Sequence, residues 1–303
     1  MSYVGQVQRV LVTTPLAVTH TFTVDGTPTD SSTAVTVDVS RLDGTVLFND
    51  QPTTQPGPTG QYRYALPGGP SAGTSATWQL DLLAVDWSAT VGGAAVVVRD
   101  WVEVVGGFLF GLSRLRDVHK TLASVTAYPW DRLAVERTKV EQECERICGQ
   151  AFVPRFVRET LTGNGSPFLR TSWPKVRRVR AVSVDGVAWS PSDVAALVPH
   201  PAGRLVRPGG ALWPTGYANV VAEYEHGWES APAEVESAGM LRMRSSLTEP
   251  TRAVPDNAVS YTVQDGSVYR LAGADDERTG VPTVDAVYQR YGGRRAKRRA
   301  VFA

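Results

Sequence analysis

Cysteine is scarce in this chain of 303 residues, which contains only two, and histidine is nearly as scarce, with four. Cys144 and Cys148 stand four positions apart in a stretch with helical periodicity, where a disulfide across one helical turn would be strained. We therefore predict two buried free thiols that pack as small apolar side chains, as suits a reducing compartment. No third or fourth ligand stands near them in the sequence, so we predict no metal site.

Motifs that carry catalysis are also absent. The sequence has no HExxH pair, Gly-rich phosphate loop, nucleophile elbow or zinc-ligand spacing. Glu223 and Glu225 share one face of a predicted strand, and paired carboxylates can serve a glycosidase or a peptidoglycan hydrolase, but nothing else builds a sugar site. Asp275, Asp276 and Glu277 lack the spacing of an EF-hand calcium loop. We predict a protein that is not an enzyme, with no catalytic residues and no cofactor.

Long apolar runs are missing as well. No run approaches the roughly 18–20 apolar residues that span a bilayer, and the first residues lack the basic and apolar regions of a signal peptide. We expect no membrane association. Hydrophobic residues make up 42% and charged residues 20% of the chain, as in ordinary globular proteins. The formal net charge is only +1, yet the last ten residues contain five cations, so a mildly acidic body carries a basic tail.

Residues 1–105 differ in composition from the rest and are rich in Thr, Val, Gly and Pro. Apolar side chains alternate along Val35–Val39, Tyr62–Leu66 and Trp78–Leu82, which is the period of a half-buried strand. Turn signals such as Gly92-Gly93 separate these stretches. Short strands at this spacing predict an all-β, immunoglobulin-like sandwich domain.

The remainder of the chain predicts helices with inserted β-hairpins. A charged amphipathic helix is expected near residues 131–150, with one apolar stripe and with Gly149 as its stop signal. Asn164-Gly165, Asp185-Gly186 and Asp265-Gly266 each offer the positive φ angles of a tight hairpin turn.

Further helices are expected at Pro232–Leu247 and Thr283–Tyr291, after which Gly292-Gly293 would release the tail. The fold class is therefore α+β and multidomain. We divide the chain into a sandwich at 1–105, a domain of helices plus β-hairpins at 111–291, and a flexible basic tail at 292–303.

Several collinear segments resemble one known family. They are SRLRDVHKTL, VEQECERICGQAFVPRFVRETLTGNG, the SWP at Ser172–Pro174, VRAVSVDGVAW, VVAEYEHGW, APAEVESAGMLRMR, VSYTVQDGSVYRL and TGVPTVDAVYQRYGG. In this order, over about residues 111–293, the chain resembles the head-to-tail connector proteins of long-tailed double-stranded DNA bacteriophages, also called adaptors or head completion proteins. The family often has Gly-Arg where this chain has Gly149-Gln150, and its minimal member lacks a counterpart of residues 1–105.

The resemblance implies a structural virion protein of the neck, assembled in the host cytoplasm. Such adaptors form a ring, expected to be a dodecamer, beneath the portal protein, extend the DNA channel and offer a platform for a stopper or tail-terminator protein. Genomic DNA would pass through without sequence-specific binding. Charged faces of the long helix would then pair between neighbouring subunits. The residues assigned to this contact are Glu136, Arg137, Lys139, Glu141, Glu145 and Arg146.

The basic tail is the strongest local candidate for a docking arm. Its cations and its apolar tip suit an acidic crevice of the portal, in which the tail would become ordered on binding. A solvated end or non-specific contact with DNA phosphates are the alternatives. The tail residues are Arg294, Arg295, Lys297, Arg298, Arg299, Val301 and Phe302.

The basic strand around residues 175–180 is a second candidate, for contact with channel DNA or with a neighbour's acidic helix. Alternation places Arg178 and Arg180 on one face, and Lys175 and Arg177 on the other, although an ordinary solvated strand has the same pattern. We place the sandwich outside the neck, against the major capsid protein or adjacent subunits. An alternative function is a receptor- or carbohydrate-binding virion protein that acts through this sandwich.

Overall fold

The computed structural model describes most of the chain, and its contacts divide it into two compact units. The first unit comprises Met1–Gly106 with the short stretches Arg155–Glu159 and Glu223–Glu225, and the second comprises the rest. Both helices and several β-sheets are present, so the α+β class is confirmed. The described residues are 7–12, 14–67, 79–248, 258–260, 270–271 and 278–299.

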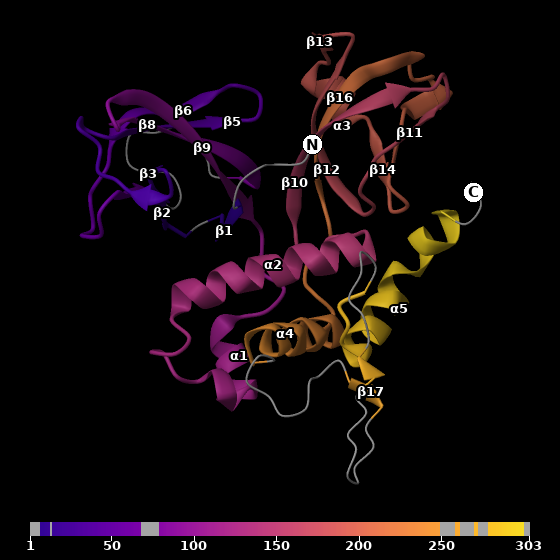
Figure 1. Ribbon diagram of the computed structural model, residues 1–303. Helices are drawn as coiled ribbons and strands as arrows, with labels where there is room; N and C mark the ends of the chain where they lie inside the picture. The colour runs from indigo at the N-terminus through magenta and orange to yellow at the C-terminus, as the bar shows by residue number, and fades with distance from the viewer. Residues whose placement is uncertain are drawn as a thin grey trace. The chain divides into compact units, whose positions relative to one another are not determined.

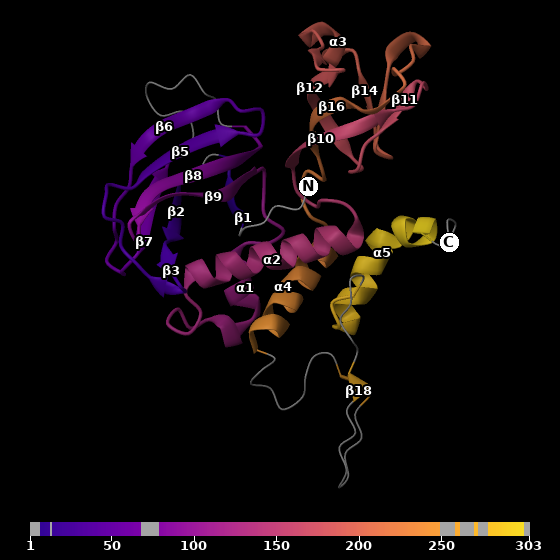
Figure 2. The same ribbon diagram turned by 45° about the horizontal axis from the view of Figure 1, so that its top comes forward.

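The first unit is built from strands (Figures 1 and 2). Its five-stranded sheet has the order β1-β9-β8-β5-β6. The edge strand β1 pairs parallel with β9, and the other neighbouring strands pair antiparallel. A two-stranded sheet pairs β2 with β7, and a short hairpin pairs β3 with β4. The strands are β1 (Val7–Leu11), β2 (Leu16–Thr21), β3 (Thr23–Val24), β4 (Thr27–Pro28), β5 (Thr36–Arg41), β6 (Val46–Pro52), β7 (Gln61–Leu66), β8 (Asp81–Val91) and β9 (Ala94–Val105).

The core of the first unit lies between its two main sheets. Val37 and Val39 of β5 and the fully buried Trp87 of β8 belong to one apolar cluster with Tyr64 and Leu66 of β7. The alternation along Val35–Val39 and Tyr62–Leu66 is therefore the inward-facing half of these strands. Along β8 the inward residues are Leu83, Val85 and Trp87, whereas Leu80 and Leu82 are not in this cluster and Trp78 lies outside the described residues. Packing of one sheet on another is confirmed, while the immunoglobulin-like relationship stays a prediction.

Helices form the core of the second unit, where α2, α4 and α5 pack against one another (Figure 1). The long helix ends as predicted, because Gly149 adopts φ 65°, a left-handed conformation that glycine tolerates best, and its N–H bonds back to the carbonyl of Glu145. Gly239 of α4 lets the chain approach closely, since a Cβ there would lie 2.7 Å from Leu109. The helices are α1 (Leu112–Val118), α2 (Trp130–Cys148), α3 (Pro191–Ala195), α4 (Ala233–Thr248) and α5 (Pro282–Arg299), with 3₁₀ turns η1 (Lys120–Leu122) and η2 (Pro208–Gly210).

The strands of the second unit form three further sheets, and one predicted hairpin among them is wrong. The strands on either side of Asn164-Gly165 enter different sheets, in the orders β10-β16-β12-β13 and β11-β15-β14. The turn signal depends on two adjacent residues, whereas β10 and β11 hydrogen-bond to β16 and β15, which lie far away in the sequence. The strands are β10 (Arg155–Gly163), β11 (Phe168–Arg170), β12 (Val176–Val184), β13 (Val187–Ala188), β14 (Val198–His200), β15 (Arg204–Val206), β16 (Gly216–His226), β17 (Ala258–Ser260) and β18 (Arg270–Leu271).

Of the other two predicted hairpins, one is confirmed, and the turn of the second lies outside the described residues. Asp185 and Gly186 have φ angles of 51° and 80° and join β12 to its antiparallel partner β13, as predicted. β17 and β18 also pair antiparallel, although Asp265-Gly266 lies outside the described residues.

The end of α5 differs from the prediction. We expected a helix that stops at Tyr291, but α5 continues through Gly292-Gly293 to Arg299. A Cβ at Gly292 would lie 3.0 Å from the carbonyl oxygen of Ile147, so this glycine permits close packing against the end of α2. The glycine pair therefore does not release the basic segment from the helix. None of the helices in the described part of the chain combines the length and hydropathy that a bilayer crossing requires.

Candidate assembly surface

The inner face of α2 contains two buried charges. Arg137 and Glu141 are 7% and 1% exposed, and they lie in the same stripe as Leu133. Glu141 accepts a 2.7 Å hydrogen bond from the backbone N–H of Leu109, and the Arg137 guanidinium lies 3.3 Å from the ring centroid of Phe108. The assignment of Arg137 and Glu141 to an inter-subunit contact is therefore wrong, because both side chains bind the chain's own segment beside α2.

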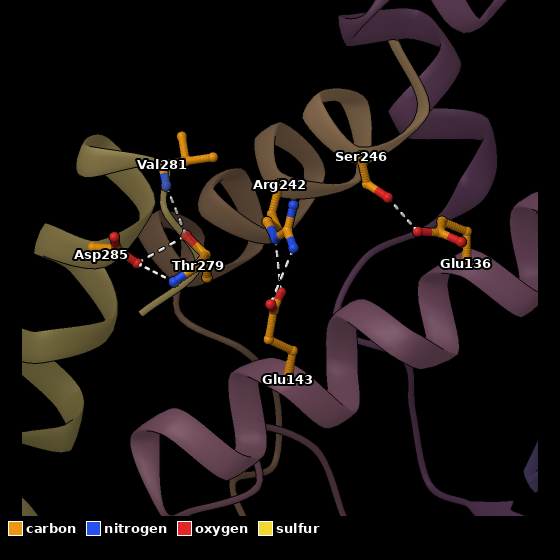
Figure 3. A network of polar contacts seen from close by, with 7 residues as sticks. All are labelled: Glu136, Glu143, Arg242, Ser246, Thr279, Val281 and Asp285. Carbon is orange, nitrogen blue, oxygen red and sulfur yellow. Dashed lines mark hydrogen bonds and ion pairs between the residues drawn. The ribbon is translucent and has the colours of Figure 1, made fainter. Parts of the chain in front are cut away.

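A second face of α2 points toward α4 (Figure 3). Arg242 donates two hydrogen bonds to the carboxylate of Glu143, at 2.7 and 3.1 Å, in the fork geometry that arginine and carboxylate favour. Ser246 donates to Glu136, which also accepts from Lys139 at 3.2 Å. Glu136 is thus half-buried and engaged within the chain, so it is a poor candidate for a contact with a neighbour.

The start of α5 is fixed by the other polar group in Figure 3. Asp285 accepts hydrogen bonds from the backbone N–H and the hydroxyl of Thr279, at 2.7 and 2.8 Å, and the Thr279 hydroxyl accepts from the N–H of Val281 at 3.1 Å. An acidic side chain in the first helical turn also complements the positive end of the helix dipole. These contacts set where α5 begins against α2 and α4.

The third face of α2 is exposed and contains three cations, with Asp131 and Glu136 at its edge, where Glu136 forms an ion pair with Lys139. Arg132, Lys139 and Arg146 recur every seven residues, so their Cα atoms lie roughly 10 Å apart along one line of the helix. Val135, 37% exposed, lies on the same face. Beside it a hollow of about 480 Å³ runs between α2 and the end of α4 at Ser246 and Leu247. We call Arg132, Lys139 and Arg146 the cationic stripe.

Glu145 and Arg146 complete the predicted inter-subunit set. Glu145 is half-buried and Arg146 is exposed. The structure thus keeps Lys139 and Arg146 of the predicted residues on the open face and adds Arg132, which the sequence reading missed. The heptad spacing of the three cations was the signal that could have found it.

The four cations of the predicted basic strand lie in different environments. Lys175 precedes β12 and places its ammonium 3.8 Å from the ring centroid of Trp228, so it is not an alternating strand residue. Arg177 forms an ion pair with Glu229, Arg178 is exposed and Arg180 is half-buried. The four cations therefore do not make one continuous surface.

The two carboxylates considered for hydrolysis lie on β16. Glu223 and Glu225 alternate with the buried residues of the strand, as predicted, and Glu223 forms an ion pair with Arg158 of β10. That partner gives Glu223 a structural role. The absence of enzymatic activity stays a prediction.

The cysteines are buried free thiols, as predicted. Burial raises the pKa of the Cys144 thiol well above its ordinary value, and the neighbouring Cys148 adds to the shift. Burial likewise raises the pKa of Tyr288, which packs beside them. The thiolate that metal binding or redox chemistry needs is therefore disfavoured at Cys144.

The basic segment falls at the end of α5. Its side chains, and the residues Val301 and Phe302, lie outside what the structure describes, as do Asp275, Asp276 and Glu277. The role of the segment stays a prediction. The cations placed in the helix are Arg294, Arg295, Lys297, Arg298 and Arg299.

No protein-family model matches the chain, and no curated protein sequence matches it. Among solved structures it is similar to a chain in the neck of an empty gene transfer agent particle, at 17% identity and a TM-score of 0.40, covering 59% of this chain and 88% of the other. A chain in the neck of a native particle is 16% identical, with a TM-score of 0.36, and the match covers 60% of this chain and 93% of the other. A chain in the native virion is 16% identical, with a TM-score of 0.32, and the match covers 52% of this chain and 76% of the other. Likeness at this level does not bear on function.

Proposed function

We propose that this protein is a structural component of a virion neck, a head-to-tail adaptor that forms a ring beneath the portal. The ring would extend the DNA channel and present a platform to a stopper or tail-terminator protein. The collinear resemblance of about residues 111–293 to phage connectors is the first support. The described elements over that span are ordered helices and short sheets joined by tight turns, which suit a building block.

The cationic stripe on α2 is the observation that carries the proposal. A ring requires a heterologous interface, in which one surface of a subunit meets a different surface of the next. Three cations on one helix face favour an acidic partner surface, and complementary charge fixes register and excludes wrong partners. The chain itself has exposed carboxylates, Asp117 and Glu229, each 80% exposed, and their ion pairs with Lys120 and Arg177 are weak because solvent screens them.

The remaining roles follow the same proposal. The basic end of α5, Arg294–Arg299, would dock on an acidic crevice of the portal, now as a helix instead of a flexible arm. The sandwich would face outward, toward the major capsid protein or adjacent subunits. DNA would pass through the ring without sequence-specific binding, and the number of subunits would be twelve.

Electron microscopy of the full chain mixed with the portal protein from the same genome tests the proposal. We expect rings stacked coaxially on the portal. Removal of residues 294–303 should abolish stacking and leave the rings, whereas the double charge reversal Lys139→Glu with Arg146→Glu should abolish the rings, because like charges then oppose each other.

Arg63→Glu is the matched control, since Arg63 of β7 is an exposed cation outside α2. It should assemble as the unaltered chain does. Rings that survive the double reversal would move the interface away from the cationic stripe. A chain that forms neither rings nor a portal complex would refute the adaptor function and favour recognition through the sandwich.

A further inference from the structure

A pocket of about 640 Å³ lies in the second unit and has no lining residue in common with the cationic stripe. Its walls come from the end of α2 at Gly149 and Gln150, the loop between β11 and β12, the turn between β14 and β15, Trp228, and α5 at Arg290–Gly292. This volume is in the range of pockets that hold small ligands or a few residues of a peptide.

The lining of this pocket is cationic. Arg170, Lys175 and Arg290 contribute to it, with His200 beside them, and no acidic residue is among the described lining residues. Arg290 is partly neutralised by its ion pair with Glu234, so Arg170 and Lys175 supply most of the available charge. The end of α2 adds a partial negative charge, which these cations exceed.

Lys175 is held in place by an unusual backbone conformation. Its φ of 56° lies in the left-handed region, which a side chain other than Gly, Asn or Asp rarely adopts. The conformation is fixed on both sides, because the N–H of Lys175 donates to Pro201 at 3.0 Å and its carbonyl accepts from Gly227 at 3.1 Å. A glycine would fit this backbone more easily, and the strained conformation places the lysine ammonium 3.8 Å from the ring centroid of Trp228 at the pocket wall.

The rest of the wall is also preformed. Thr171 donates through its hydroxyl to the carbonyl of Trp173 at 2.8 Å and through its N–H to Gly203 at 3.1 Å, which ties the two loops together. Gln150 accepts a hydrogen bond from the indole of Trp228 and donates to the carbonyl of Tyr291, both at 3.1 Å. A rigid site loses less entropy when it binds a ligand.

The pocket combines this charge with apolar surface. Pro174, Ala202, Trp228 and Tyr291 line it together with the cations. A ligand that fits must offer an anionic group beside an apolar side chain. The chain's own basic segment is excluded by charge, and a nucleic acid strand would be better served by an open basic groove that follows its phosphates.

We infer that this pocket binds an acidic peptide segment of a partner protein, with a carboxylate at Lys175 and Arg170 and an apolar side chain against Pro174 and Ala202. The inference does not depend on ring formation or on portal binding. Its failure and the failure of the adaptor function are therefore separate results.

Fluorescence anisotropy with a labelled peptide, Leu-Asp-Glu-Leu-Asp, and the full chain tests this inference. We expect saturable binding, at least about tenfold weaker for the amide peptide Leu-Asn-Gln-Leu-Asn. Lys175→Gly keeps the backbone conformation and removes the ammonium, and with Arg170→Gln it should weaken binding by at least about tenfold. Lys120→Gln is the matched control, with one exposed cation removed elsewhere.

Three outcomes would overturn the inference: no saturable binding of the acidic peptide, equal binding of the acidic and amide peptides, or equal affinity of the Lys175→Gly, Arg170→Gln double variant and the control. Displacement of the peptide by a short oligothymidine at equal or lower concentration would assign the pocket to nucleic acid instead. Circular dichroism of each variant confirms that a lost affinity does not reflect a lost fold.

Discussion

The two units of this protein have cores of different chemistry. The core of the first unit is a single cluster of aliphatic and aromatic side chains around Trp87. The helical core of the second unit also contains Cys144 and Met243, and it borders the buried ions Arg137 and Glu141. Both units also bury charge: in the first unit Arg9 and Arg155 pair with Glu103 at 2.6 and 3.7 Å, and in the second Glu141 holds the segment around Leu109 in place.

The largest expected effects come from substitutions of buried side chains, one in each unit. Glu141→Ala should destabilise the second unit by about 1 to 3 kcal/mol, because it leaves the buried N–H of Leu109 without its acceptor. Hydrogen exchange measured by mass spectrometry reports the two units separately, and protection should fall in α2 but not in β8.

Trp87→Ala is the counterpart in the first unit, where a large cavity should cost about 3 to 5 kcal/mol and lower protection in β8 but not in α2. A Glu141→Ala chain with unchanged protection of α2 would contradict the importance of the buried ions. In that case the two cores would differ in composition only.

Features with a strong local signal could be predicted from the sequence. The alternation along β5 and β7, the stop at Gly149 and the turn at Asp185-Gly186 depend on neighbouring residues alone, and all appear as expected. The pairing of β10 with β16 depends on residues far apart in the chain. No local turn signal specifies such a pair, which is why the hairpin at Asn164-Gly165 was wrong.

The predicted surface erred for a different reason. Arg137 and Glu141 were assigned to the open face because they are charged, although their spacing of four and eight residues from Leu133 places them in the buried stripe. Periodicity was the better guide than residue type. The pocket around Lys175 has no sequence signal of its own, because five separate segments meet there only in the folded chain.

The two units should lose stability at different alkaline pH values. The folded-state pKa values of Cys144 and Tyr288 are raised, so their contribution to stability is complete below the pKa of the unfolded chain, about 8.5 and 10, and is lost as the pH rises toward the folded values. The second unit should therefore lose up to about 1.4 kcal/mol per pH unit through Cys144 above about pH 8.5, and up to as much again through Tyr288 above about pH 10.

In the first unit burial raises the pKa of Tyr64, so its decline should start only near pH 10. Urea unfolding at several pH values, with proteolysis to follow each unit, measures both curves. Cys144→Ala should remove the part of the loss that begins near pH 8.5. An unaltered curve for this variant would show that the thiol does not contribute to the loss.

Two arginine–carboxylate ion pairs have similar bidentate geometry but differ in exposure. Comparing them therefore tests how burial changes the contribution of an ion pair to stability. Arg99 donates to Asp86 through Nε and Nη2 at 2.6 Å each, and Arg242 donates to Glu143 through the same atoms at 2.7 and 3.1 Å, but their side chains are 54% and 19% exposed. Arg99→Met should cost less than about 1 kcal/mol, since solvent and salt screen the pair. Arg242→Met should cost about 1.5 kcal/mol or more, because Glu143 then keeps a half-buried charge without its partner. Equal losses in urea unfolding would mean that geometry, and not burial, sets the strength of these pairs in both units.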